Sequence, residues 1–380
     1  MLDTTANEMG VAKLDSTAEN QGALDSDKAT TISQHWDKLA SQGYQRDNAR
    51  LSWGGLTRVA QNHNRLTTGR EDWYWIDYFR DTYFPEGQAG DVLSLGCGEG
   101  RIERLLKERG FVFRSVTGVD ISQACIESAT TAARAVDLAP EINYRAADVD
   151  TIELPEAAYD FIFFFHSLHH VSALEHVLRA CARALRPGGI LMVNEFVGPT
   201  RFQWTEEQLA MANAILSILP PELRVDLVSN EIKEVIAAPP VETMIAIDPS
   251  EAVRSADIES VLQQHFNIIE EKPWGGTLTH ILFENIAGNF DQSNPLHDAL
   301  VRLIILHEDT LIANKVLPSD FKFLVARAKP ESEAQSLRYA LDLANSQLED
   351  TRRQLEAVYA SRSWRLLGPM RRLIEMLRRS

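Results

Sequence analysis

Apolar runs alternate with segments of helical periodicity between residues 91 and 329. This alternation is typical of an α/β fold, in which crossover helices join the strands of a sheet. Strands that are covered on both faces are expected to be almost continuously apolar. The segments that we predict as strands are 92–95, 116–119, 142–146, 161–165, 190–193, 266–272 and 321–326, of which 161–165 is the most strongly apolar. We therefore predict a mostly parallel, seven-stranded sheet with helices on both faces.

Capping residues and helix-breaking residues mark the helices between these strands. The predicted helices are 102–109, 122–137, 174–185 and 250–265. In the last of these, Ser250 would be the N-cap, and Glu251 would favour the first turn through the helix dipole. We therefore interpret residues 248–255 as a structural helix start.

The chain that precedes the sheet divides into two parts. Residues 1–29 are polar and are predicted to be disordered. Residues 30–90 form a predicted helical cap, because their apolar side chains gather on helical faces and in an aromatic stretch at 73–84. The residues that share the first helical face are Ile32, Trp36 and Leu39.

Three further segments are distinguished by their composition. Prolines interrupt residues 198–249, and we interpret this segment as an insertion of the 91–329 domain at the carboxyl end of the fifth strand, the edge where such sheets bind ligands. Apolar residues of 330–360 follow steps of four and three, which predicts a short helical hairpin or a weak coiled coil, and a coiled coil would allow a homo-oligomer. Residues 361–380 form a basic amphipathic tail.

The charge of the chain limits its partners. The formal net charge is −16, which argues against binding to nucleic acid. The tail carries six arginines against one acid, a net charge of +5, so the rest of the chain carries about −21. This asymmetry indicates a different partner for the tail. The three cysteines lack zinc or disulfide spacing, and the sequence shows neither a signal peptide nor a membrane span, so we expect a cytoplasmic protein.

Candidate ligand-binding residues follow the first three strands. The glycine-rich segment 96–100 stands between a strand and a helix, where the backbone can turn tightly and approach a ligand. Asp120 ends the second strand, where a carboxylate can accept both ribose hydroxyl protons of an adenosine. Asp148 ends the third strand and can reach an adenine amino group. Read singly, each could be a turn residue, but their order along the chain predicts an adenosine-containing cofactor.

Five segments resemble, in order, the conserved motifs of class I S-adenosylmethionine (SAM)-dependent methyltransferases: LSLGCGEG, VTGVDIS, AADVD, YDFIFFFHSLHHV and LRPGGILMVNE. The resemblance covers about 91–195 and implies a Rossmann-like fold with SAM as the cofactor. On this basis we assign cofactor binding to Gly96, Cys97, Gly98, Gly100, Asp120, Ile121, Asp148, Val149 and His166.

One position departs from the family pattern. Ser94 stands where the family usually has an acidic residue, which commonly orients the loop or the methionine end of SAM. A dinucleotide-dependent oxidoreductase is the alternative enzyme class. Its fingerprint requires a third glycine where this chain has Arg101, so we favour the methyltransferase.

Three imidazoles follow the fourth strand: His166, His169 and His170. The resemblance implies that His169 faces the acceptor pocket, and we predict that it is the general base. We assign His170 to a helix start or to packing, and any of the three could instead only shape the loop. Glu195, at the end of the fifth strand, could assist catalysis or bind the substrate. The histidines lack the spacing of a helical metal pair, so we predict no metal.

The acceptor is less well defined by the sequence. Arginine and aromatic residues at 73–75 and 201–204 suit a polar, ring-bearing or anionic substrate, although they could equally pack the cap. We expect methylation of a small-molecule or glycan acceptor, with oxygen favoured over nitrogen or carbon. Alternatives are a natural-product or protein methyltransferase and a non-catalytic SAM-binding scaffold that recruits partners through its tail.

Residues 361–372 resemble a terminal motif that follows coiled coils in bacterial glycosyltransferases and methyltransferases of surface-polysaccharide synthesis. The resemblance implies a role in polysaccharide synthesis. The basic amphipathic tail could bind the inner face of a membrane or a protein partner. It could also be an ordinary helix that packs on its own chain.

Overall fold

The computed structural model describes residues 16–42, 51–136 and 141–330, together with 341, 348 and 351–353. The chain divides into two units, one of residues 27–329 and one of residues 1–26 with 330–380. Nearly all of the predicted coiled coil and the whole basic tail lie outside the described residues. No helix in the described part is long and apolar enough to cross a membrane.

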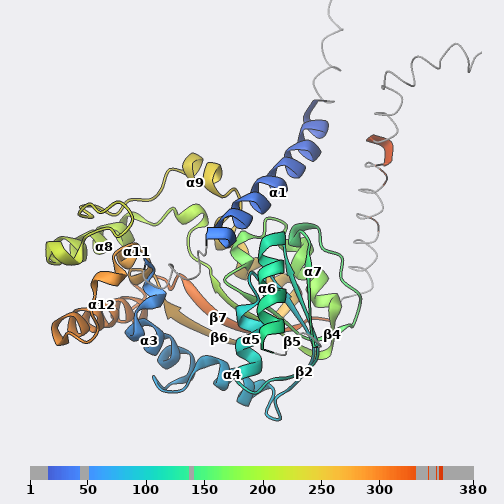
Figure 1. Ribbon diagram of the computed structural model, residues 1–380, viewed down its shortest axis with the longest axis horizontal. Helices are drawn as coiled ribbons and strands as arrows, with labels where there is room; N and C mark the ends of the chain where they lie inside the picture. The colour runs from blue at the N-terminus through green and yellow to red at the C-terminus, as the bar shows by residue number, and fades with distance from the viewer. Residues whose placement is uncertain are drawn as a thin grey trace, which may run out of the picture. The chain divides into compact units, whose positions relative to one another are not determined.

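Within the described residues, seven strands form one sheet in the order β3-β2-β1-β4-β5-β7-β6 (Figure 1). Each predicted strand is present, and most are longer than their apolar run. The strands are β1 Gln88–Leu95, β2 Val112–Asp120, β3 Ile142–Ala146, β4 Tyr159–Phe165, β5 Leu185–Phe196, β6 Phe266–Gly275 and β7 Phe321–Ala328.

The sheet is mixed, which corrects the prediction of a mostly parallel sheet. Strands β3, β2, β1, β4 and β5 pair in parallel, whereas β7 is antiparallel to both β5 and β6. The reason lies in the connection 276–320. It leaves the sheet at the end of β6 and returns to the same edge at the start of β7, so β7 must run in the opposite direction.

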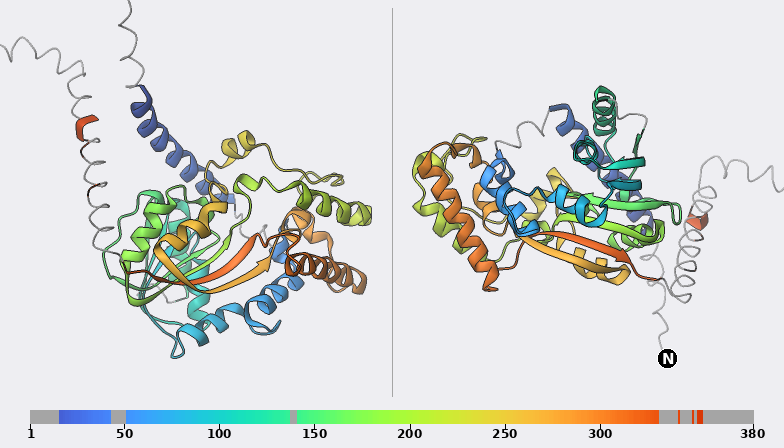
Figure 2. Two further views of the ribbon diagram at one scale, coloured as in Figure 1. Left: turned by 180° about the vertical axis from the view of Figure 1, so that it is seen from behind. Right: turned by 90° about the horizontal axis from the view of Figure 1, so that it is seen from below.

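Two hydrophobic cores lie on opposite faces of the sheet, because successive strand residues point to opposite sides. On one face Val92 and Phe161 pack with Phe79 of α4 (Trp75–Tyr83). On the other face Leu93 and Ile162 pack with residues of α7 (Leu174–Ala184) and α10 (Ile258–His265). Figure 2 shows the sheet between these helices.

The remaining helices complete the covering layers and the insertion. Helices α3, α8, α11 and α12 pack together beside β6 and β7. The bounds are α1 Ser16–Gln42, α3 Thr57–Thr68, α5 Arg101–Glu108, α6 Gln123–Ala135, α8 Glu206–Ile218, α9 Val241–Ile247, α11 Thr279–Phe283 and α12 Pro295–Ala313. Short 3-10 turns include η2 Val149–Thr151, η3 Leu168–His170 and η6 Ser255–Asp257.

Two helices begin at residues other than those expected from the sequence. Helix α1 begins at Ser16, inside the segment predicted to be disordered, and it contains no proline up to Gln42. Helix α10 begins at Ile258 rather than after Ser250. Asp248 accepts hydrogen bonds from the Ser250 amide at 2.7 Å and from its hydroxyl at 2.6 Å. Residues 248–250 thus form a side-chain turn, and the 3-10 turn η6 (Ser255–Asp257) precedes the helix.

Candidate active site

A cavity of about 880 Å³ lies at the carboxyl ends of β1, β2 and β4. The ends of parallel strands meet at one edge of a sheet, which is where ligands bind in folds of this kind. Of the residues predicted to bind a cofactor, all except Gly100 line this cavity.

The glycine loop takes a backbone conformation that favours glycine. Gly96 has φ +69° and Gly98 has φ +51°. A Cβ at Gly96 would collide with the side chain of Ser167, so the loop fits closely against the end of β4. Gly100 instead precedes α5 as its N-cap, with φ +69°, and lies against Tyr144. Gly100 therefore starts helix α5 and does not line the cavity.

Asp120 holds the loop from the end of β2. Its Oδ2 accepts a hydrogen bond from the Gly98 amide at 2.8 Å, and its Oδ1 accepts one from the Ser122 amide at 2.9 Å. Burial raises the pKa of Asp120. Each carboxylate oxygen has two acceptor sites, so lone pairs remain for the hydroxyl groups of a ribose.

Asp148 lines the same cavity, beside Val149. Its Oδ1 accepts a hydrogen bond from the Asp150 amide at 2.9 Å. Burial raises the pKa of Asp148. Together with the glycine loop and Asp120, this carboxylate forms a polar row that fits an adenosine.

Helix α1 covers this part of the cavity. Oδ1 of Asp37 accepts hydrogen bonds from the Ser122 hydroxyl at 2.6 Å and from the Ala124 amide at 3.0 Å. The ring of Trp36 meets His170 edge-on, with centroids 5.2 Å apart. The helix is thus attached both at the start of α6 and at η3.

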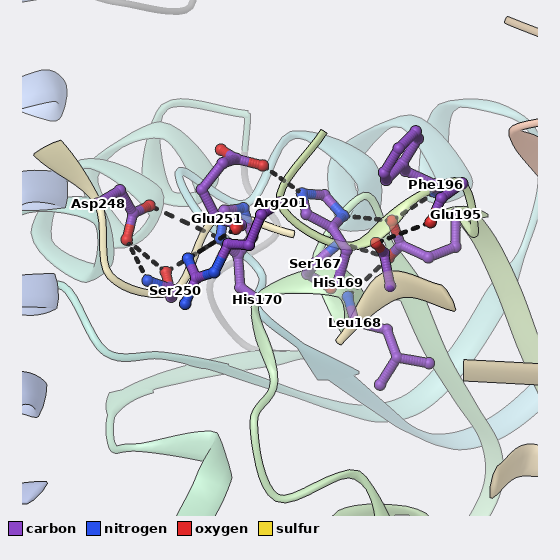
Figure 3. Close-up of polar contacts among 12 residues, drawn as sticks. Ser167, Leu168, His169, His170, Glu195, Phe196, Arg201, Asp248, Ser250 and Glu251 are labelled. Carbon is purple, nitrogen blue, oxygen red and sulfur yellow. Dashed lines mark hydrogen bonds and ion pairs between the residues drawn. The ribbon is translucent and has the colours of Figure 1, made fainter. Parts of the chain in front are cut away.

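His169 of η3 and Glu195 near the end of β5 form a buried pair (Figure 3). Nδ1 of His169 lies 2.5 Å from Oε1 of Glu195. Burial lowers the pKa of His169, but the charge of Glu195 and the two hydrogen bonds to carboxylates outweigh this effect and raise it to about 10. His169 lines the cavity, and its role as a general base stays a prediction.

Glu195 itself does not reach the cavity. Its Oε2 accepts hydrogen bonds from the amides of Ser167 at 2.8 Å and Leu168 at 2.6 Å, and its Oε1 accepts one from the Phe196 amide at 2.7 Å. The residue is 0% exposed. These bonds leave Glu195 no oxygen for a substrate, so it orients His169 and fixes η3.

Glu251 approaches His169 from the opposite side, as Figure 3 shows. Its Oε1 lies 3.4 Å from Nε2 of His169. Burial raises the pKa of Glu251, but the nearby charges of His170 and His169 and the hydrogen bond with His169 lower it to about 2. Glu251 is therefore a carboxylate, and His169 lies between two negative groups.

The segment that carries Glu251 is held by several bonds. Arg201 donates to the backbone carbonyls of Pro249 at 2.7 Å and Glu251 at 2.9 Å. Nδ1 of His170 lies 3.0 Å from the Ser250 hydroxyl. Arg201, which was considered as a substrate-binding residue, therefore positions this segment.

His166 faces a different part of the cavity. Its ring contacts Phe165, Trp274 and Phe321, with centroids 4.5, 6.2 and 5.7 Å away. Burial lowers the pKa of His166 to about 4, so the ring is neutral. The aromatic arm of the cavity consists of His166 together with Trp53, His63, Phe202, Trp274, His280 and Phe321.

The aromatic arm has few charged groups. Burial lowers the pKa of His63 to about 3 and that of His280 to about 4. Trp53 stacks on Trp274 at 5.3 Å, with the ring planes 7° apart. One nitrogen of each histidine, Nε2 of His63 and Nδ1 of His280, is buried without a hydrogen-bond partner among the described residues. The arm thus offers apolar walls and unused polar atoms to a ligand.

A metal could also be held at this site. Donor atoms of His169, His170 and Glu251 all lie within 4.8 Å of one another. Glu251 completes this set but is distant in sequence from the two histidines, so the spacing of the histidines alone could not predict it. In the structure, however, carboxylates contact both nitrogens of His169.

Residues 93–193 match the family model described as a methyltransferase domain. Among curated relatives, the 27-O-demethylrifamycin SV methyltransferase of Amycolatopsis mediterranei is 35% identical over 111 residues, which are 29% of this chain and 40% of the relative. The ubiquinone biosynthesis O-methyltransferase of Idiomarina loihiensis is 32% identical over 99 residues, 26% of this chain and 39% of the relative. The chain thus spans about two fifths of the length of these relatives.

Among solved structures, a SAM-dependent methyltransferase from Mesorhizobium loti is 18% identical, with 67% of this chain and 96% of that chain covered and a TM-score of 0.38. The chain carries a class I methyltransferase domain, and SAM is the cofactor of this domain. The glycine loop, Asp120 and Asp148 fit that cofactor.

Proposed function

We propose that the protein transfers the methyl group of SAM to a hydroxyl group of a small, ring-bearing acceptor. The observation that carries the proposal is the position of His169, which lies between Glu195 and Glu251 and lines the same cavity as the glycine loop. A base at this place serves an acceptor that must lose a proton, and a hydroxyl is such an acceptor.

SAM supplies an electrophilic methyl group, and its sulfur departs with the electron pair of the broken bond as S-adenosylhomocysteine. The protein has to align the acceptor oxygen with the methyl carbon, which can contribute roughly 7–11 kcal/mol. Nε2 of His169 receives the hydroxyl proton when the imidazole is neutral. Glu251 contacts this nitrogen and is 28% exposed, so it can pass the proton towards solvent.

The aromatic arm supports an acceptor with a flat, apolar ring. Stacked indoles and neutral histidines favour such a surface over a charged one. A phenolic hydroxyl has a pKa of about 10, as in tyrosine. It can therefore transfer its proton to His169, whose pKa is also raised to about 10. The names of the rifamycin and ubiquinone relatives describe methyl transfer to oxygen in those proteins.

Formation of S-adenosylhomocysteine by the full chain tests the proposal, with phenolic compounds, monosaccharides, glycans and amines offered as acceptors. We expect turnover with phenols and a loss of roughly 10²- to 10⁴-fold in His169→Ala, with SAM affinity unchanged. His307→Ala serves as the control, because His307 lies on α12 and does not line the cavity. Turnover only with glycans would select the sugar hydroxyl, and turnover only with amines would overturn methylation of oxygen. Binding of SAM without turnover on any acceptor would favour a scaffold.

A further inference from the structure

A carboxylate that the proposed reaction does not use lies at the wall of the cavity. Glu103 belongs to the first turn of α5, lines the cavity and is 0% exposed. Neither of its carboxylate oxygens has a hydrogen-bond partner among the described residues. A buried carboxylate without partners is strongly disfavoured unless it is protonated or meets a cation. Its position therefore points to a ligand.

The described neighbours of Glu103 do not neutralise it. Arg104 follows it in α5, but its guanidinium donates to the carbonyl of Glu99 at 2.7 Å. The hydroxyl of Ser94 interacts with the Glu103 carboxyl and lowers its pKa, but burial has the larger effect and raises the pKa to about 7. The other titratable groups that face Glu103 are acids: Cys97, Asp120 and Tyr144.

The order of the strands places Glu103 on the path of the cofactor. Asp148 follows β3, and Asp120 ends β2. Next in the strand order, β1 contains Ser94, whose hydroxyl interacts with Glu103 of α5. His169 follows β4. If the adenosine lies at the two aspartates and the methyl group faces His169, the methionine part of SAM must cross the end of β1. That part carries an ammonium group, which is the kind of cation that Glu103 lacks.

We propose that Glu103 binds the ammonium group of the methionine part of SAM. Helix α5 then supplies the negative charge that Ser94 does not supply from β1. The assignment rests on SAM as the cofactor and not on the identity of the acceptor. Binding of the cation also favours the ionised form of Glu103, so a proton leaves the protein when SAM binds near neutral pH.

Calorimetric titration of the full chain with three ligands tests this role. The ligands are SAM, S-adenosylhomocysteine and 5′-methylthioadenosine, and the last contains the adenosine and sulfur without the amino acid. We expect Glu103→Gln to weaken binding of the first two roughly 10- to 100-fold, the loss typical of one charged hydrogen bond. Binding of 5′-methylthioadenosine should change less than twofold. Glu108→Gln, at an exposed position of the same helix, should leave all three unchanged.

Two further measurements separate binding from a structural role. Titration in buffers of different ionisation enthalpy at pH 7 should detect proton release with SAM in the wild type and none in Glu103→Gln. Moving the carboxylate back to the strand, in Ser94→Asp/Glu103→Gln, should restore most of the affinity. Equal loss for all three ligands, or no loss with SAM, would overturn the assignment. Failure of the wild type to bind SAM would instead overturn the cofactor.

Discussion

Oε1 of Glu251 lies 3.4 Å from Nε2 of His169, on the side of the imidazole opposite Glu195. The two carboxylates come from segments that are far apart in the sequence, and together they keep a proton on the ring. His169 can therefore act as a base only after this proton has left.

Replacement of Glu251 by glutamine should shift the pH dependence of methyl transfer. Loss of a negative charge beside His169 lowers the pKa of the imidazole from about 10, so the rise of kcat/KM with pH should move to lower pH by about one pH unit. Measurement of kcat/KM between pH 6 and 10 checks this shift. Glu242→Gln, in α9, provides a charge-matched control. An unchanged profile would remove His169 from the proton transfer.

Replacement of Glu195 by glutamine should destabilise the fold by about 3–5 kcal/mol, because it breaks a buried ion pair and leaves His169 charged without its partner. The pKa of His169 is raised from 6.5 to about 10. The contribution of His169 to this stabilisation is therefore fully present below pH 6.5 and is lost as the pH rises through 10. The lowered pKa of Glu195 means that the stabilisation is also lost in acid, below about pH 4.5.

Urea unfolding of the wild type and Glu195→Gln at pH 6 and pH 10 measures this effect. The difference in the free energy of unfolding should be smaller at pH 10. Glu156→Gln is the control, since Glu156 is exposed and its replacement should change stability by less than about 0.5 kcal/mol. A difference that does not vary with pH would contradict an ion pair.

Asp120→Ala should weaken SAM binding roughly 10- to 100-fold, because the ribose loses a charged acceptor and Gly98 loses the bond that holds the loop. Calorimetry with SAM measures the loss. Asp72→Ala, at an exposed position, should bind SAM as the wild type does. Comparable affinities for the two variants would place the cofactor elsewhere.

Alanine substitutions at two glycines distinguish the effect of backbone strain from the effect of a steric collision with a neighbouring side chain. Gly96 has φ +69° and Gly188 has φ +84°, so alanine strains the backbone at either position, by about 1–2 kcal/mol. Only at Gly96 would the added methyl group collide with Ser167, since nothing lies within 4 Å at Gly188. Gly96→Ala should abolish SAM binding, and Gly188→Ala should lower the melting temperature while SAM still binds. Retention of binding in both would show that the loop can adjust.

Removal of divalent metal should leave methyl transfer unchanged. His169, His170 and Glu251 are close enough to hold an ion, but the proposed proton transfer requires a free Nε2 on His169. Treatment with a chelator followed by desalting, with metal content measured before and after, checks this expectation. Loss of the rate that is restored by one divalent metal would replace the acid–base assignment with a metal site.

The strands could be predicted from the sequence, because they depend on local patterns. The positions of Asp120 at the end of β2 and of Asp148 just after β3 followed from these strands, while their contact with a cofactor stays a prediction. The direction of β7 could not be predicted, since it depends on where the connection 276–320 returns to the sheet.

Glu103 and Glu251 were both missed for the same physical reason. An acid in or near the first turn of a helix is explained by the helix dipole, and so a sequence gives no reason to seek a second role. The structure shows Glu103 buried without a cationic partner among the described residues, and Glu251 against His169. The aromatic arm was missed because Trp53, Trp274 and Phe321 lie in distant segments.

The reversal of β7 has a consequence for the evolution of specificity. It brings Trp274, at the end of β6, and Phe321, at the start of β7, to the same edge as the glycine loop, and the segment between them starts and finishes there. Changes in the length or sequence of 276–320 can therefore alter the proposed acceptor pocket while the five parallel strands that carry the proposed cofactor residues stay as they are. A change of acceptor specificity is therefore compatible with retained binding of the methyl donor.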